Sequence, residues 1–166
     1  MPERSSIVLV GLRYDEFYAH TLANGYLKAY TDAQPELAER YASVMVERTV
    51  HEPLASQLSE ILGHDPDIVT FSCYLWNFSR VTELCRALKA ARPDLRIVLG
   101  GPEVSVRGPA VLAEIPGADV VVQGEGEVTF AEVLRAWAGG RDLGGVLGAI
   151  FRRGGEAVAN PERPLI

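Results

Sequence analysis

Cysteine is scarce in this sequence, because only Cys73 and Cys85 occur among its 166 residues. Two cysteines cannot build the framework of several disulfides that stabilises many small secreted domains. Basic residues are also few: 16 lysines and arginines stand against 22 acidic residues, which gives a formal net charge of −6. Arg152–Arg153 is the only adjacent basic pair. The composition therefore excludes a general attraction to nucleic acid or to anionic membranes.

Long apolar runs are missing as well. No stretch approaches the roughly 18 apolar residues that a membrane-spanning helix needs. The apolar run that follows Ser6 is too short for a signal peptide. The chain is therefore expected to be cytoplasmic. Its length suits one domain that buries about 70% of the surface exposed by the unfolded chain.

Short β-branched runs alternate with longer segments of helical spacing. Strands are expected at 7–10, 44–50, 67–71, 95–99 and 118–122, and helices at about 21–30, 53–63, 78–91, 109–115 and 128–137. Two weaker strands, 149–151 and 157–158, flank a Gly154–Gly155 turn and predict a hairpin. The pattern predicts a doubly wound, Rossmann-like or flavodoxin-like α/β fold, with a five-stranded parallel sheet, helices on both faces and a small C-terminal β-hairpin. We expect the α/β domain to occupy 1–145, and the hairpin and a linker to occupy 146–166.

Ligands of such sheets bind beyond the carboxyl ends of the strands, so the loops at 12–20, 72–77, 100–105 and 123–129 are the candidate sites. The loop after the fourth strand begins with Gly100 and Gly101. The missing Cβ atoms would let a bulky ligand approach the backbone, although a tight turn before a helix would also explain the pair. The loop after the fifth strand has Thr129 where a dinucleotide fingerprint has its third glycine, which argues against an NAD site.

The loop after the third strand carries the most chemical information. A hydroxyl at Ser72 is followed by Tyr74, Leu75 and Trp76. Such side chains would cover a large, flat, partly apolar ligand. An alternative is that Trp76 only covers the core beneath the next helix.

Three segments together resemble a known family: FSCYLWN, IVLGGPE and ADVVVQGEGEVTF. The pieces LVGLRY and NGYLKAY and the tail RRGGEAVANPERPLI resemble it too. The family is the N-terminal cobalamin (vitamin B12)-binding domain of B12-dependent radical SAM enzymes. The resemblance extends over nearly the whole chain, with the motifs in the same order.

The resemblance implies that the chain binds cobalamin base-off, with the dimethylbenzimidazole nucleotide tail detached from cobalt and inserted along the sheet. Ser72 would stand near that tail, and Gly100 and Gly101 would let the tail lie close to the backbone. Tyr74, Leu75 and Trp76 would face the lower side of the corrin ring. The full set of expected cofactor-binding residues is Leu12, Arg13, Tyr14, Ser72, Cys73, Tyr74, Leu75, Trp76, Asn77, Gly100, Gly101, Pro102, Glu103, Gly124, Glu125, Gly126 and Thr129.

No protein ligand to cobalt is expected. Methionine synthase and the mutases share a D-x-H-x-x-G segment after the first strand, whose histidine ligates cobalt, and residues 13–18 lack that pattern. His20 lies nearby but is more typical of a surface or capping residue. The loss of an axial donor would favour low-coordinate cobalt, which transfers a methyl group more readily.

Full-length enzymes of that family hold a [4Fe–4S] cluster and SAM with a C-x-x-x-C-x-x-C motif. This sequence has no such spacing, so the chain should not be catalytic alone. Its expected partners are cobalamin and a radical SAM domain or subunit. Two alternatives stay open: a stand-alone corrinoid carrier or sensor, and a hydrolase of glutaminase-like fold with Cys73 as nucleophile.

Overall fold

The computed structural model describes residues 4–15 and 21–164, and one sheet organises them. Five parallel strands form most of this sheet, and an antiparallel pair completes it in the order β2-β1-β3-β4-β5-β6-β7. The strands are β1 (Ser5–Arg13), β2 (Tyr41–Thr49), β3 (Ile68–Ser72), β4 (Arg96–Gly100), β5 (Val120–Val122), β6 (Ala149–Arg153) and β7 (Glu156–Ala159). The predicted doubly wound α/β fold is confirmed.

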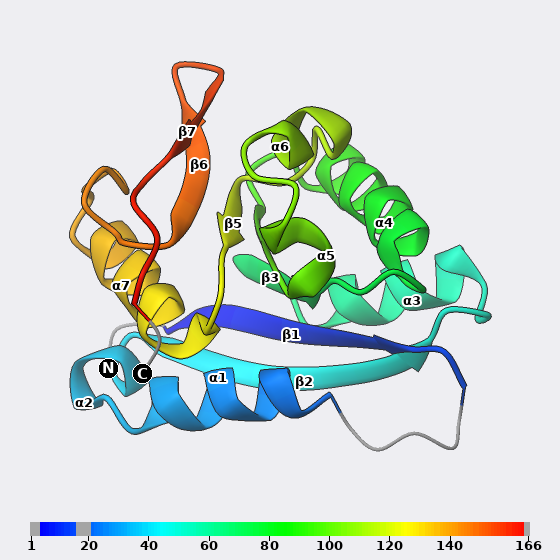
Figure 1. Cartoon of the computed structure of the whole chain (residues 1–166). Helices are drawn as coiled ribbons and strands as arrows, with labels where there is room; N and C mark the ends of the chain where they lie inside the picture. Colours follow the sequence, from blue (N-terminus) through cyan, green and yellow to red (C-terminus); the bar gives the residue numbers. More distant parts are fainter. Residues whose placement is uncertain (1–3, 16–20, 165–166) are drawn as a thin grey trace.

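Helices cover both faces of the sheet (Figure 1). One face carries α1 (Leu22–Asp32), α2 (Pro35–Ala38) and α7 (Gly126–Ala138). The other face carries α3 (Leu54–Gly63), α4 (Phe78–Ala91), α5 (Pro102–Ser105) and α6 (Ala110–Glu114). Alternation along β1 divides the core, because Ile7 packs with the α1–α7 side and Val8 with the α3–α6 side. Both cores are apolar, as expected of parallel strands buried on two faces.

The direction of chain progression reverses beside β1. The chain passes from β1 to β2 on one side and then crosses to β3 on the other side of β1. Such a switch point opens a crevice at the carboxyl ends of the two central strands. The loops that follow β1, β3, β4 and β5 therefore meet at one edge of the sheet.

Strand β1 is longer than its sequence predicts. The prediction ended the strand before Gly11, but β2 continues to pair with β1 to the pair Arg13–Thr49. Pairing with β3 ends earlier, at Val10 and Phe71. Leu12 is consequently a buried strand residue rather than part of a loop, and its position in the sequence gave no sign of the extra pairing.

The helix predicted at 109–115 is present as α6, and a short helix that the sequence did not predict, α5, precedes it. Pro102 begins α5 directly after Gly101, and α6 covers only Ala110–Glu114. Pro35 begins the additional short helix α2. Proline at the first helical position is favourable because its missing N–H has no partner there in any helix. The one-turn helices α2 and α5 are too short to produce a periodic apolar pattern.

The C-terminal hairpin is confirmed, and it extends the sheet. Gly154 and Gly155 form its turn with φ values of 60° and 89°, as a two-residue hairpin turn requires. Strand β6 pairs antiparallel with β5, and Ile150 and Phe151 contribute to the two cores. Figure 1 shows the β6–β7 hairpin projecting beyond the helices.

Candidate functional site

A cavity of about 220 Å³ lies at the carboxyl edge, between the sheet and the helices α1 and α7. We call it the slot. Its floor comes from adjacent strands, where Ser72 pairs in register with Gly100 and Gly100 with Val122. The slot is lined by Ala23, Leu27, Thr70, Phe71, Ser72, Tyr74, Val98, Leu99, Gly100, Gly101, Pro102, Val122, Gly124, Gly126, Glu127 and Phe130. Its volume is below the roughly 300–1,000 Å³ of pockets that enclose whole drug-sized ligands, so it is too small to enclose a ligand of that size.

Two polar side chains, Thr70 and Ser72, interrupt the apolar floor. They point to the same face of β3 because side chains alternate along a strand. The Ser72 hydroxyl donates a hydrogen bond to Asn24 Oδ1 at 3.2 Å. Within the described part of the chain, Thr70 Oγ1 and Asn24 Nδ2 have no hydrogen-bond partner. Buried polar groups are normally paired, so these two unpaired atoms are unusual features beside the slot.

The two glycines after β4 have different roles. A Cβ at Gly100 would find open space, with Val122 O as its nearest neighbour at 3.8 Å. A Cβ at Gly101 would lie only 2.5 Å from Cys73 O, and the residue has a φ of 102°. Gly101 therefore permits close packing of two loops, whereas Gly100 keeps the floor of the slot open.

The start of α7 closes one side of the slot. Gly124 adopts a φ of 67°, and Glu125 precedes the first helical residue, Gly126. A Cβ at Gly126 would lie 3.2 Å from Leu27 Cδ2. The small residue thus lets α1 and α7 approach each other over the slot.

Asn77 fixes the loop after β3. Its side chain is fully buried and accepts a hydrogen bond from Tyr74 N at 2.8 Å. Its amide group donates to Ser72 O at 2.9 Å and to Leu12 O at 3.2 Å. The anchored loop presents the rings of Tyr74 and Trp76, which stack with centroids 4.5 Å apart and planes 4° from parallel. Asn77 is therefore a positioning residue for an aromatic platform.

Large apolar side chains are exposed on the segments that follow β1, β3 and β4. Leu75 is 81% exposed and Val106 is 84% exposed, values unusual for apolar residues on adjacent loops. We call the set the rim: Tyr14, Leu22, Tyr26, Leu75, Trp76 and Val106. Gathered apolar exposure of this kind marks ligand or protein contact surfaces.

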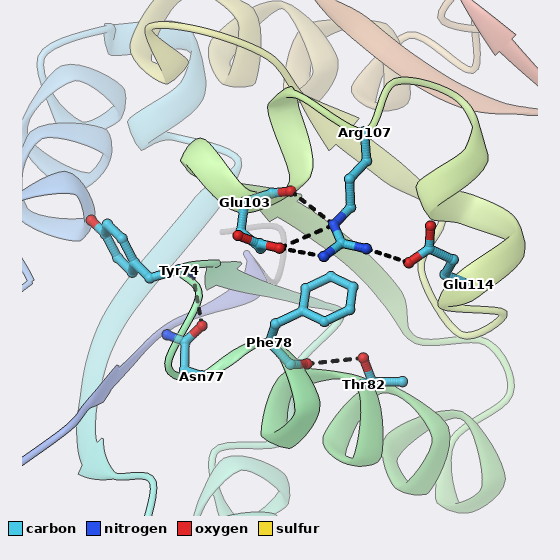
Figure 2. Close-up of polar contacts among 7 residues, drawn as sticks. All are labelled: Tyr74, Asn77, Phe78, Thr82, Glu103, Arg107 and Glu114. Atoms are coloured by element: carbon cyan, nitrogen blue, oxygen red, sulfur yellow. Dashed lines mark hydrogen bonds and ion pairs between the residues drawn. The ribbon is translucent and has the colours of Figure 1, made fainter.

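An ion-pair cluster links the segments that follow β3 and β4 (Figure 2). Arg107 pairs with Glu103 and Glu114, and its guanidinium lies 4.2 Å from the ring centroid of Phe78. Glu103 N also donates to Cys73 O at 3.3 Å. The Glu103 carboxylate is thus engaged by Arg107 and directed away from the slot.

Cys73 lies beneath these loops and is fully buried. Burial raises the pKa of its thiol well above the ordinary value, with smaller contributions from Cys85 and Glu103. The Sγ atom lies 3.8 Å from Phe71 O. A nucleophilic cysteine needs a lowered pKa and access to substrate, so this environment argues against the hydrolase alternative.

The buried thiols predict alkaline sensitivity. Burial raises the pKa of Cys73, Cys85 and Tyr41. Above pH roughly 8.5 the unfolded thiols lose their protons, whereas the folded thiols keep them, so the unfolded state binds fewer protons and stability falls. We expect the free energy of unfolding, measured by urea titration, to decrease between pH 8 and pH 10. A Cys73→Ala, Cys85→Ala double variant should show a smaller decrease, and an equal decrease would contradict this assignment.

The structure distributes the predicted site residues over several places. Ser72, Tyr74, Gly100, Gly101, Pro102, Gly124 and Gly126 line the slot, and Tyr14, Leu75 and Trp76 belong to the rim. Thr129 is fully buried away from the slot, donates to Leu147 O at 3.0 Å and accepts from Arg163 Nε at 2.9 Å. Leu12, Arg13, Cys73, Asn77, Glu103 and Glu125 also lie outside the slot lining. His20 is outside the described residues.

Nine residues that line the slot were not predicted from the sequence. The missed residues are Ala23, Leu27, Thr70, Phe71, Val98, Leu99, Val122, Glu127 and Phe130. Thr70 offered a usable signal, since it is a polar residue inside a buried apolar strand two positions before Ser72. Nothing local to α1 indicated that Leu27 would face the slot.

A larger cavity of about 580 Å³ lies at the opposite edge, by the amino ends of the strands. Charges of both signs line it, including Glu39, Asp67 and Arg96. We place the functional site at the slot, because ligands of open α/β sheets bind at the carboxyl edge and the rim lies there.

Two further findings concern the described ranges 4–15 and 21–164. They contain no group of three or more His, Cys, Asp or Glu side chains arranged to hold a metal ion. None of their helices has the length and apolar character needed to cross a bilayer.

Comparison with known proteins identifies the family. A sequence model of the B12 binding domain matches residues 9–134. The 2-(S-pantetheinyl)-carbapenam-3-carboxylate methyltransferase of Streptantibioticus cattleyicolor is 37% identical over 148 residues, which are 86% of this chain and 20% of the relative. The cobalamin-dependent radical SAM methyltransferase TokK of Streptomyces tokunonensis is 33% identical over 161 residues, which are 94% of this chain and 22% of TokK. The chain thus spans about a fifth of the length of these curated relatives.

Solved structures support the same fold. The cobalamin-dependent S-adenosylmethionine radical enzyme OxsB, with aqua-cobalamin and S-adenosylmethionine bound, matches with a TM-score of 0.79 and 19% identity over 98% of this chain and 23% of its own. A cobalamin-binding protein from Desulfitobacterium hafniense matches with a TM-score of 0.60 and 20% identity over 81% of this chain and 59% of its own. The sequence match covers most of the fold, including β3, β4 and β5, whose carboxyl ends form the slot. The chain therefore belongs to the B12-binding domain family.

Proposed function

We propose that this domain binds cobalamin base-off, with the lower nucleotide base inserted into the slot and the corrin ring resting on the rim. The observation that carries the proposal is the open floor at Gly100, between Ser72 and Val122. A side chain there would occupy the space that the base needs. The volume of about 220 Å³ supports the proposal, because a single aromatic base would fit such a slot and a corrin would not.

The side chains of the rim support the proposed contact with the corrin ring. The Tyr74–Trp76 stack presents a flat aromatic surface beside the opening of the slot, and Leu75 extends it. A corrin is broad, flat and partly apolar, so contact with these side chains would remove apolar surface from water on both partners. Asn77 would hold the platform in position before the ligand arrives, which lowers the ordering cost of binding.

We further infer that the domain supplies its corrinoid to a radical SAM methyltransferase system. The chain holds only Cys73 and Cys85, both buried, so its own residues cannot provide three thiolates for an iron–sulfur cluster. Cluster and SAM would belong to another domain or subunit, in line with the small share of the curated relatives that this chain spans. Bound cobalamin would supply the methyl-carrying cobalt, while the residues of this chain bind and orient it.

The test is a titration of the purified chain with hydroxocobalamin, followed by desalting and a visible spectrum. We expect a stoichiometric corrinoid with a base-off spectrum. A base-on spectrum would retain cobalamin binding and overturn the insertion of the base. Absence of saturable binding in equilibrium dialysis would overturn the proposal as a whole.

Tryptophan fluorescence can test at which edge of the sheet the ligand binds. Trp76 lies on the rim, whereas Trp137 lines the cavity at the opposite edge. In a Trp137→Phe variant, corrinoid binding should quench the remaining Trp76 emission strongly by energy transfer to the corrin. The matched Trp76→Phe variant should show weaker quenching, and the reverse order would place the ligand at the other edge.

A further inference from the structure

The two ends of α7 are held by different parts of the chain. Near its C-terminal end, Tyr41 Oη donates to Leu134 O at 2.9 Å, which ties the helix to β2. Arg135 pairs with Glu36 and ties the same end to α2. The N-terminal end, which carries the slot-lining residue Phe130, is held instead by residues 160–164, which we call the terminal segment. Figure 1 shows this segment, in red, passing beside the start of α7.

Arg163 makes the side-chain contacts between the terminal segment and α7. Its Nε donates to Thr129 Oγ1 at 2.9 Å, and its guanidinium pairs with Glu132. Arg163 Nη2 also donates to Leu147 O at 3.4 Å, the carbonyl to which Thr129 donates at 3.0 Å. The Arg163 side chain is only 16% exposed, and hydrogen bonds from a charged donor are stronger than neutral ones. Arg163 thus joins the start of α7, the loop before β6 and the terminal segment.

Backbone hydrogen bonds connect the terminal segment to the same wall of the slot. Gly148 N donates to Pro161 O at 2.8 Å, and Gly148 O accepts from Gln123 N at 2.9 Å. Gln123 directly precedes Gly124, which lines the slot. Gly148 has a φ of 76°, and a Cβ added there would lie 3.2 Å from Thr129 Oγ1. The loop before β6 is therefore packed closely between the slot wall and the terminal segment.

We propose that Arg163 is a positioning residue for the slot: it fixes the start of α7 over the sheet, and occupation of the slot in turn stabilises the terminal segment. The inference rests on the proposed function, since it needs the lower base to enter the slot. Thr129 and Glu132 do not line the slot, whereas Phe130 does, so Arg163 acts through the helix rather than by touching the ligand. A contact that favours ligand binding is favoured by the ligand to the same extent.

Arg163→Gln is the direct test, because it removes the charge and the planar fork of donors but keeps a polar side chain. Dissociation constants are measured by equilibrium dialysis for cobalamin and for cobinamide, which lacks the nucleotide. We expect the variant to bind cobalamin about five- to tenfold more weakly, at the lower end of couplings between sites. Its affinity for cobinamide should stay native, because no base enters the slot. A general loss of structure would lower both affinities alike.

Arg135→Gln is the matched control. Arg135 also forms an ion pair that ties α7 to another segment, but at the end of the helix remote from the slot. The same substitution there should leave the affinities for cobalamin and cobinamide native. An equal loss of cobalamin affinity in the two variants would show that the slot depends on the anchoring of α7 in general, and the specific role of Arg163 would be wrong.

The reverse effect is measurable in the native chain. The Gly148 amide reports on the terminal segment, because it donates to Pro161 O. Saturating cobalamin should slow its hydrogen exchange, followed by NMR, by the same factor of about five to ten, since coupling between two sites is reciprocal. Cobinamide should leave the exchange rate unchanged. The measurement uses no variant, so it tests the inference even if Arg163→Gln fails to fold.

Two further results would overturn the inference. One is native cobalamin affinity in Arg163→Gln, and the other is a Gly148 exchange rate that cobalamin does not change. Either result, obtained with base-off cobalamin binding to the native chain, would overturn this inference alone. A base-on spectrum, or no saturable binding of cobalamin by the native chain, would overturn the proposed insertion of the base and this inference with it.

Discussion

Gly100→Leu should bind cobalamin about 50- to 100-fold more weakly than the native chain and should still fold. The leucine would project into the slot between Ser72 and Val122, where a Cβ meets nothing closer than 3.8 Å. Excluding the base would forfeit the burial of roughly 100 Å² of apolar surface, which at about 25 cal/mol per Å² is about 2.5 kcal/mol. Equilibrium dialysis gives the affinity, and the spectrum of any residual complex should be base-on.

Gly63→Leu is the matched control for this experiment. Gly63 ends α3 on the opposite face of the sheet, is exposed, and has open space around an added Cβ. Its substitution adds the same side chain without touching the slot, so cobalamin affinity should stay native. Native affinity in Gly100→Leu, with a base-off spectrum, would show that the base lies elsewhere.

Gly101→Ala should lower the stability of the fold strongly, whereas Gly100→Leu should lower only the affinity for cobalamin. Its φ of 102° and ψ of 168° belong to a region that is essentially restricted to glycine. An added Cβ would also lie 2.5 Å from Cys73 O and 2.9 Å from Cys73 N. Backbone strain and the clash together should lower the free energy of unfolding by about 3 kcal/mol or more, measured by urea denaturation.

Gly108→Ala separates the cost of backbone strain from the cost of a steric clash. Gly108 also has a positive φ, 59°, but an added Cβ would meet nothing within 4 Å. It should cost only about 1 kcal/mol, the penalty of a left-handed conformation for alanine. If both variants lost equal stability, contact with the Cys73 backbone would not explain the requirement for glycine at position 101.

The sequence alone predicts the strands, their alternation with helices and the loops at the carboxyl edge, which the structure brings together beside the slot. Buried runs such as Ile7–Val10 identify parallel strands directly, because such strands are apolar on both faces. The sequence could not assign separate roles to Gly100 and Gly101. Gly101 permits the close packing of two loops, whereas Gly100 leaves space at the floor of the slot; approach of a ligand at Gly100 stays a prediction.

Side chains that reach the site from other elements could not be predicted. Leu27 enters the slot from α1, and its orientation depends on the contact of α1 with α7 at Gly126. Asn77 is a loop residue by its position, yet its hydrogen bonds to Leu12 and Ser72 join two strands. Both outcomes depend on pairs of residues far apart in the chain, and a single sequence carries no information on such pairs.

The antiparallel strand β6 also affects the colloidal behaviour of the protein. Without it, β5 would present three consecutive valines, Val120–Val122, along an unpaired edge of backbone groups. Short apolar edges of this type template intermolecular β-pairing. The hairpin moves the free edge to β7, which is short, largely exposed and begins with Glu156. A fragment that stopped before Ala149 would therefore be prone to aggregate through β5, so the hairpin protects the folded protein from self-association.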